Sequence, residues 1–223
     1  MKTLLTVLFS FAAFAVSHAG FEMVQELNQT GPQGTMTVQT VTKAEGDMMR
    51  VDAGTDVTTI INTAKKEIKT LMHKQKAFMQ VPSSVIENAE KMALEQEAKM
   101  KDIPAPTPTG KTQQINGYNC SEYVQELDGN KMTFWLTKDL KGADKLLAEA
   151  KGMGNFDPFK GSVKNLSGTE GFPIRIEIES PQIGRMQITT LSIKEATIPA
   201  AEFEAPADYK AFAMPGGLAP SQP

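Results

Sequence analysis

Residues 48–62 read MMRVDAGTDVTTIIN, and this stretch decides the fold class. Two short runs rich in Met, Val, Thr and Ile flank Ala53-Gly54, a pattern typical of a β-hairpin. Similar runs, separated by two to four polar residues, continue on both sides of it. Hairpins in series predict an antiparallel meander, in which strands that are consecutive in the chain are neighbours in the sheet.

Two segments show helical rather than alternating patterns. Ser84 and Glu87 form a capping box before the helix formers that reach residue 101, and the Pro-rich residues 102–109 predict an extended connector. Residues 138–152 carry Leu and Ala at helical spacing and predict a second helix. The fold class is therefore mainly β (α+β): a single curved antiparallel open sheet or half-barrel of about 10–11 strands with two covering helices. The strands are expected at 21–27, 35–43, 48–52, 56–62, 67–72, 77–81, 111–115, 118–127, 131–137, 171–180 and 185–194.

The first 19 residues are expected to be removed. A positive start at Lys2, an apolar run from Leu4 to Val16 and Ser17-His18-Ala19 fit a secretory signal peptide cleaved after Ala19. We therefore expect a periplasmic or secreted protein without a transmembrane segment after cleavage. Residues 20–210 form one domain with a helical insertion at 83–101, and the Pro- and Gly-rich residues 211–223 form a disordered tail.

Composition narrows the chemistry. The 223 residues include 2 His, 1 Cys and a net charge of −3, which becomes −4 when the signal peptide leaves. This balance argues against a nucleic-acid partner, and no cofactor or metal cluster is expected. Cys120 is interpreted as buried, and His73 as an exposed histidine in a Lys-rich turn that no triad uses. The paired carboxylates Glu177 and Glu179 indicate a solvated strand face.

The strand order and several local motifs resemble known exported proteins. The motifs are GDMMRVD (46–52), TIIN (59–62), KTQQINGYNCSEY (111–123), WLTKDL (135–140), GFP (171–173) and FEAPADY (203–209). In this order they resemble the exported family called domain of unknown function 4412. The architecture is similar to that of the periplasmic outer-membrane lipoprotein carrier and sorting proteins (LolA/LolB-like). The latter resemblance implies a hydrophobic cavity that holds acyl chains.

The function predicted is non-enzymatic binding of a lipid or other hydrophobic ligand on a concave β-sheet, with the helix after Ser84 as a cover. Methionine is flexible and polarizable, so the Met-rich strands suit a cavity for varied apolar ligands, although ordinary gap filling in a thin core is the more general explanation of them. The first alternative is an envelope scaffold that binds an envelope protein partner and whose sheet is filled by the 138–152 helix. The second alternative is a hydrolase that uses His73. The predicted ligand-lining residues are Met132, Phe134, Leu136, Phe172, Ile174, Ile176 and Ile178.

Overall fold

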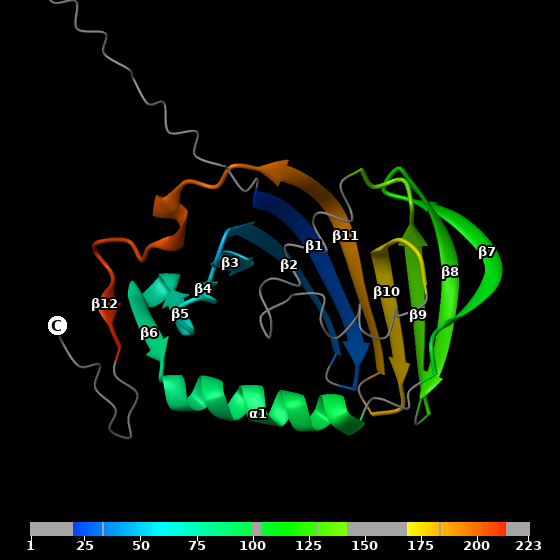
Figure 1. The fold of residues 1–223 in the computed structure, drawn as a ribbon, viewed down its shortest axis with the longest axis horizontal. Helices are drawn as coiled ribbons and strands as arrows, with labels where there is room; N and C mark the ends of the chain where they lie inside the picture. The colour runs from blue at the N-terminus through cyan, green and yellow to red at the C-terminus, as the bar shows by residue number, and fades with distance from the viewer. Residues whose placement is uncertain are drawn as a thin grey trace, which may run out of the picture.

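A single twelve-stranded sheet, strongly curved and open, dominates the molecule (Figure 1). The computed structural model describes residues 20–32, 34–99, 104–127, 129–141, 169–182 and 184–212. The sheet order is β12-β6-β5-β4-β3-β2-β1-β11-β10-β9-β8-β7. The strands are β1 (Gly20–Gly31), β2 (Gly34–Glu45), β3 (Met48–Ala53), β4 (Val57–Asn62), β5 (Glu67–Met72), β6 (Ala77–Val81), β7 (Thr107–Ile115), β8 (Tyr118–Leu127), β9 (Asn130–Thr137), β10 (Phe172–Ser180), β11 (Gly184–Ala196) and β12 (Lys210–Ala211).

Two antiparallel meanders build this sheet, as the hairpin pattern predicts. Strands β1 to β6 follow one another on one side and β7 to β11 on the other. Gly46 and Gly54 make tight turns with φ of 56° and 59°, a conformation that glycine adopts without steric penalty. The two meanders meet where β1 pairs with β11, so the beginning and the end of the domain form the centre of the sheet.

One strand departs from the predicted antiparallel pattern. Strand β12 runs parallel to β6, held by hydrogen bonds from the N–H of Lys210 to the carbonyl of Lys76 (3.0 Å) and from Phe212 to Phe78 (2.7 Å). It is reached by a long return over the sheet through the 3₁₀ turn η4 (Ala200–Phe203) rather than by a hairpin. The expectation of antiparallel pairing throughout was wrong here, because only a hairpin forces neighbouring strands to run in opposite directions.

The expectation of two covering helices is also corrected. In the described ranges there is one α-helix, α1 (Ser83–Lys99), together with the 3₁₀ turns η1 (His73–Gln75) and η4. Residues 138–141 continue beyond β9 without helical structure, and the Asp139 carboxylate instead accepts hydrogen bonds from the backbone N–H (3.0 Å) and side chain (2.9 Å) of Asn119. The rest of the predicted second helix lies in 142–168, outside the described residues, as do the predicted signal peptide and almost all of the predicted tail.

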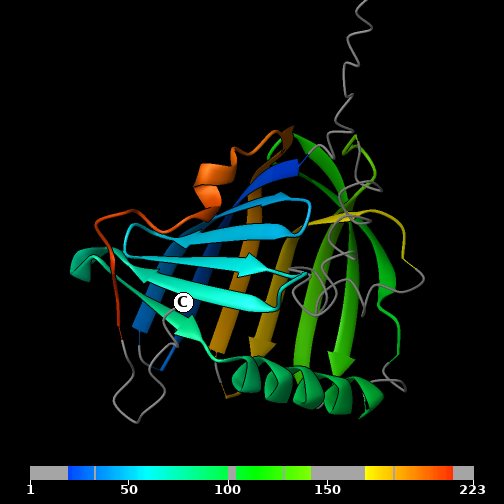
Figure 2. The same cartoon turned by 60° about the vertical axis from the view of Figure 1, so that its left-hand side comes forward.

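The curvature brings distant strands together. Asn116, in the turn between β7 and β8, donates a hydrogen bond to the carbonyl oxygen of Thr190 in β11 at 2.8 Å. Because β8 is the third neighbour of β11, a flat sheet would separate them by about 14 Å. Figure 2 shows the other consequence of this twist: β3 to β6 cross over β1, β2 and β11 at a steep angle, and α1 runs along one end of the sheet.

Three apolar clusters hold the sheet. The largest includes the fully buried Phe21, Met23, Phe172 and Ile174. The second joins Ile60 and Leu71 of the sheet to Ile198 and Phe203 of the C-terminal return. The third contains Phe134, Leu136 and Ile176, with Tyr123, Met132 and Ile178 packed against them. No helix in the described part of the chain is long and apolar enough to cross a membrane.

Candidate ligand-binding face and the polar network behind it

An apolar row crosses the middle of the sheet. Residues that face each other on antiparallel strands lie on the same side of the sheet. The register therefore gives one line of neighbours across β8, β9, β10, β11, β1 and β2. Its members are Tyr123, Phe134, Ile176, Ile188, Leu27 and Val38, all six apolar or aromatic.

A second row, the methionine row, runs beside it on the same face. It consists of Gln125, Met132, Ile178, Met186, Gln29 and Met36. Phe134 in the first row has no exposed surface, whereas Met132, Ile178 and Met186 are half-buried and Met36 is 49% exposed. Leu27, Val38, Tyr123 and Ile188 of the first row are half-buried as well, so both rows contribute accessible apolar surface, and Met36 is the most exposed of their apolar side chains.

The seven predicted lining residues divide between two clusters. Met132, Phe134, Leu136, Ile176 and Ile178 pack in the third cluster, as the alternation predicts. Phe172 and Ile174 instead belong to the largest cluster. The register of β10 against β9 shifts between Pro173 and Arg175, and such a bulge breaks the alternation that the sequence pattern assumes.

A cavity of about 390 Å³ lies at the β1–β2 end of the methionine row. Gln29 and Met36 of that row line it, together with Gly31, Pro32, Gly34, Thr35 and Gln182. Between the apolar row and the main cluster the register places Thr40, Gln25 and Thr190, and the Gln25 amide donates a hydrogen bond to the Thr190 hydroxyl at 3.4 Å. Neutral amide and hydroxyl groups are therefore the polar chemistry of this region.

Charge divides sharply between the two faces. Neither row contains a charged side chain. The intervening positions on the same strands point to the opposite face and include Glu26, Lys131, Arg175, Glu177 and Arg185. Arg185 and Glu177 form an ion pair there at 2.9 Å, and Glu177 and Glu179 lie away from the apolar rows, on the face predicted to be solvated. The strand faces therefore separate an uncharged surface from an ionic one.

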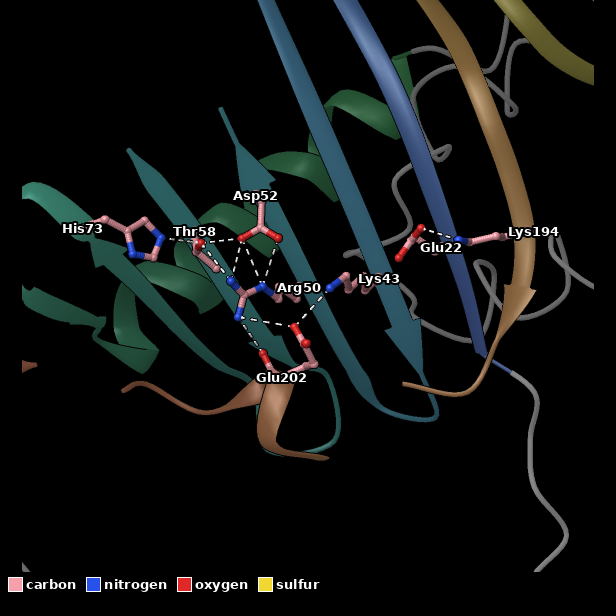
Figure 3. A network of polar contacts seen from close by, with 8 residues as sticks. All are labelled: Glu22, Lys43, Arg50, Asp52, Thr58, His73, Lys194 and Glu202. Atoms are coloured by element: carbon pink, nitrogen blue, oxygen red, sulfur yellow. Dashed lines mark hydrogen bonds and ion pairs between the residues drawn. The ribbon is translucent and has the colours of Figure 1, made fainter. Parts of the chain in front are cut away.

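A polar network occupies the ionic face of the first meander (Figure 3). The Nε atom of Arg50 donates to both oxygens of Asp52 at 3.0 Å, and Thr58 donates to Asp52 at 2.5 Å. Thr58 Oγ1 also lies 2.7 Å from Nε2 of His73, whose Nδ1 lies 2.6 Å from the hydroxyl of Tyr209. In Figure 3, η4 lies in front of these strands and α1 behind them, so the network and α1 are on opposite sides of the sheet.

The hydrogen positions in the series of hydrogen bonds from Asp52 through Thr58 and His73 to Tyr209 follow from its acceptors. The Asp52 carboxylate only accepts, so the single hydroxyl hydrogen of Thr58 is used there. Thr58 must then accept from the Nε2–H of His73, which leaves Nδ1 as the acceptor for the Tyr209 hydroxyl. With an uncharged ring this order corresponds to the Nε2–H tautomer, and the hydrogen bonds then run from Tyr209 through His73 and Thr58 to Asp52.

This network corrects the interpretation of His73 as an exposed turn residue. His73 is half-buried and hydrogen-bonded on both ring nitrogens. Its partners lie 15 and 136 residues away, and only the pairing of β4 with β5 and the return of the C-terminal segment bring them close. Sequence spacing contains no signal for such a contact.

The network fixes the C-terminal return to the sheet. Arg50 donates to the backbone carbonyl of Glu202 at 2.8 Å, and Lys43 binds the Glu202 carboxylate at 3.1 Å. Tyr209 adds its hydroxyl to His73 and its ring to the second cluster. Three of the motifs noted in the sequence, at 46–52, 59–62 and 203–209, therefore meet at one place.

The family model described as "Domain of unknown function (DUF4412)" matches residues 21–209. The chain belongs to this family. The match begins at Phe21 of β1 and ends at Tyr209, the residue that closes the network on His73. No curated protein matches the sequence.

Solved structures with a similar arrangement of the chain are distant. A structure of PNGF-II is 12% identical to this chain with a TM-score of 0.37. The match covers 88% of this DUF4412 chain but only 31% of the length of the PNGF-II chain. A LolA superfamily protein from Nitrosomonas europaea is 10% identical with a TM-score of 0.37, with 84% of this chain and 90% of that one covered. A DUF1329 family protein from Desulfovibrio piger is 8% identical with a TM-score of 0.26, covering 85% and 91%.

The stability of this DUF4412 domain should fall in acid through Asp52. Burial alone would raise the pKa of Asp52, but the hydrogen bonds from Arg50 and Thr58 and the charges of Arg50 and Lys43 outweigh it and lower this pKa below its usual value. A lowered pKa stabilises the fold above the unfolded-state pKa of about 4, and this contribution is lost as the pH falls through the folded-state value. The free energy of unfolding of Asp52→Asn should depend less steeply on pH below about 4 than that of wild type. The free energies of unfolding are measured by urea denaturation at several pH values. Equal pH dependence of this free energy in the variant and in wild type would contradict the prediction.

The tautomer assignment makes Tyr209→Phe an informative change. The variant keeps the ring in the second cluster but removes the donor to His73 Nδ1. We expect a loss of about 1 kcal/mol in the free energy of unfolding, measured by urea denaturation, because one hydrogen bond in a half-buried site is lost. A change below about 0.3 kcal/mol, within the range of ordinary surface substitutions, would argue against this hydrogen bond.

The single cysteine is buried, as predicted. Cys120 is 1% exposed, and burial, as the largest cause, raises the pKa of its thiol to about 11. Because the thiolate is the reactive form, labelling of Cys120 by a maleimide at pH 8 should be at least about 100-fold slower in the folded than in the urea-unfolded protein. Mass spectrometry measures the labelling rates. Comparable rates in the folded and the urea-unfolded protein would show that the region around Cys120 in β8 opens freely.

Proposed function

We propose that this protein is an exported, non-enzymatic binding protein that holds a lipid acyl chain or a similar apolar ligand along the methionine row. The observation that carries this proposal is the uncharged face: two adjacent rows of six residues cross six strands without one charged side chain. Accessible methionines in the second row supply flexible, polarizable contacts that adapt to ligands of different shape.

The dimensions of the row suit a single chain. Six strands spaced by about 4.8 Å make the row about 24 Å long, compared with about 15 Å for an acyl chain in one leaflet of a bilayer. Each buried methylene would contribute about 0.8 kcal/mol, so a dozen methylenes would supply about 10 kcal/mol, compared with an association cost of about 4 kcal/mol or more. Helix α1, on this side of the sheet, would act as the predicted cover (Figure 1).

The polar network supports a structural rather than a catalytic role for His73. Thr58, the hydroxyl next to His73, is fully buried and already donates its hydrogen to Asp52. In the described residues no three His, Cys, Asp or Glu side chains gather in a metal-binding arrangement. The proposed periplasmic or secreted location rests on the signal-peptide pattern of residues 1–19.

One observation favours the alternative of an envelope scaffold. Phe134 and Leu136 are 0% and 3% exposed, so atoms of the chain itself already cover this part of the face. If the methionine row were covered in the same way, the face would be a core and the protein an interaction module.

Native mass spectrometry of the protein purified from its own host distinguishes the two functions. We expect a mass increment that organic extraction removes and identifies as lipid, and binding of a neutral fluorescent probe such as Nile red by the extracted protein. Absence of both the increment and probe binding would reject ligand binding and favour the scaffold.

A further inference from the structure

Gln125 carries the single buried side-chain oxygen or nitrogen that lacks a hydrogen-bond partner in the described part of the molecule. Its side chain is on β8, and the residue is 4% exposed. A buried acceptor without a donor is costly, and native proteins contain few of them. Oε1 itself has almost no accessible surface, so its missing donor has to be a small group, either a water molecule or a hydroxyl or amide N–H of a ligand, that enters beside it.

The neighbouring backbone fixes which amide atom is unpartnered. Nε2 of Gln125 donates a hydrogen bond to the carbonyl oxygen of Pro104. Turning the amide over would place two carbonyl oxygens against each other, since Pro104 offers no donor. The unpartnered atom is consequently Oε1, which accepts hydrogen bonds and donates none.

This acceptor lies at one end of the methionine row. Gln125 faces Met132 across the β8–β9 pair, and Met132 in turn faces Ile178. Pro104 belongs to the segment between α1 and β7, where the chain returns to the sheet. An amphiphile lying along the row would thus meet the Gln125 amide at one end.

We infer that Gln125 binds the polar head of the ligand, and that this ligand is an uncharged single-chain amphiphile with a hydroxyl or amide N–H. The inference rests on the proposed function and deepens it. A hydroxyl supplies the donor that Oε1 lacks. A carboxylate or phosphate would present only acceptors, and it would meet no positive charge on this face. A cationic head would lose its hydration and gain no carboxylate in either row.

Three ligands with the same chain test this. Displacement of bound Nile red compares 1-monooleoylglycerol, which has hydroxyl donors, with methyl oleate, which has none, and with oleate, which is charged. Wild type should bind monooleoylglycerol about tenfold or more tightly than methyl oleate, and oleate most weakly. In Gln125→Met the preference for monooleoylglycerol should fall to about one, with methyl oleate affinity kept.

The matched control is Gln187→Met, a half-buried glutamine of β11 that faces Glu177 on the ionic side of the sheet, away from both rows. It should retain the full preference for monooleoylglycerol. If wild type binds monooleoylglycerol and methyl oleate equally, water satisfies Gln125, and the head-group inference fails while the proposed function stands. If none of the three ligands binds, both fail. The wild-type comparison needs no variant, so it decides the matter even if Gln125→Met does not fold.

Discussion

Replacing Ile178 by aspartate should abolish binding of an apolar ligand while the sheet remains folded. Ile178 is half-buried in the methionine row, between Met132 of β9 and Met186 of β11. A carboxylate there must either lose its hydration under the ligand or keep the ligand away. Transfer of an unpaired charge into apolar surroundings costs several kcal/mol, so affinity for Nile red or a neutral lipid should fall at least about 100-fold.

Two controls separate this loss from a change in folding. Ile178→Val keeps an apolar side chain and should bind within about threefold of wild type. Glu179→Gln changes a charge at the adjacent position, which faces the ionic side, and should leave binding unchanged. If Ile178→Asp does not fold, Met36→Asp tests the same row at a residue that is 49% exposed. Undiminished binding by these folded aspartate variants would show that the ligand lies elsewhere.

Phe21→Ala should produce the largest loss of stability of any single truncation considered for this protein. Phe21 is fully buried at the start of β1, where it faces Ala44 of β2 and lies in the largest cluster. It packs beside the pairing of β1 with β11, which is the junction of the two meanders. Removing a buried phenyl ring leaves a cavity and costs about 3–5 kcal/mol of the free energy of unfolding.

A second phenylalanine provides the matched control. Phe212, just after β12, is 51% exposed, and Phe212→Ala should change the free energy of unfolding by less than about 0.5 kcal/mol. Both variants are compared by urea denaturation monitored by the fluorescence of Trp135, the single tryptophan. A loss below 1 kcal/mol in Phe21→Ala would mean that the junction is not held by this cluster.

Alternation was sufficient to predict most of the sheet. Met132, Phe134 and Leu136 share a face because strand side chains alternate, and turn residues such as Gly46 and Gly54 marked the hairpins. The second meander was found for the same reason. Local sequence contains this information because each hairpin is a local structure.

Long-range geometry was not predictable in this way. The bulge at Ile174 moved two expected ligand-lining residues to another cluster; Pro173 inside a strand is compatible with a bulge, but it does not fix which side chains change face. His73 acquired Tyr209 as a partner through a return of the chain that no spacing encodes. The unpaired oxygen of Gln125 depends on where Pro104 lies after α1. Each of these features depends on tertiary contacts rather than on periodicity.

The pairing of β1 with β11 has a consequence for the kinetics of folding. Met23 faces Ile193, so the central contacts of the sheet join residues separated by most of the domain. Closing so long a loop costs entropy before the contacts compensate for it, and folding rates fall as such non-local contacts come to dominate. During synthesis the first meander leaves the ribosome long before β11 exists, and the centre of the sheet must wait for it. A chain with this topology stays incompletely folded until its synthesis is nearly finished, the state in which a polypeptide can still be threaded through an export channel.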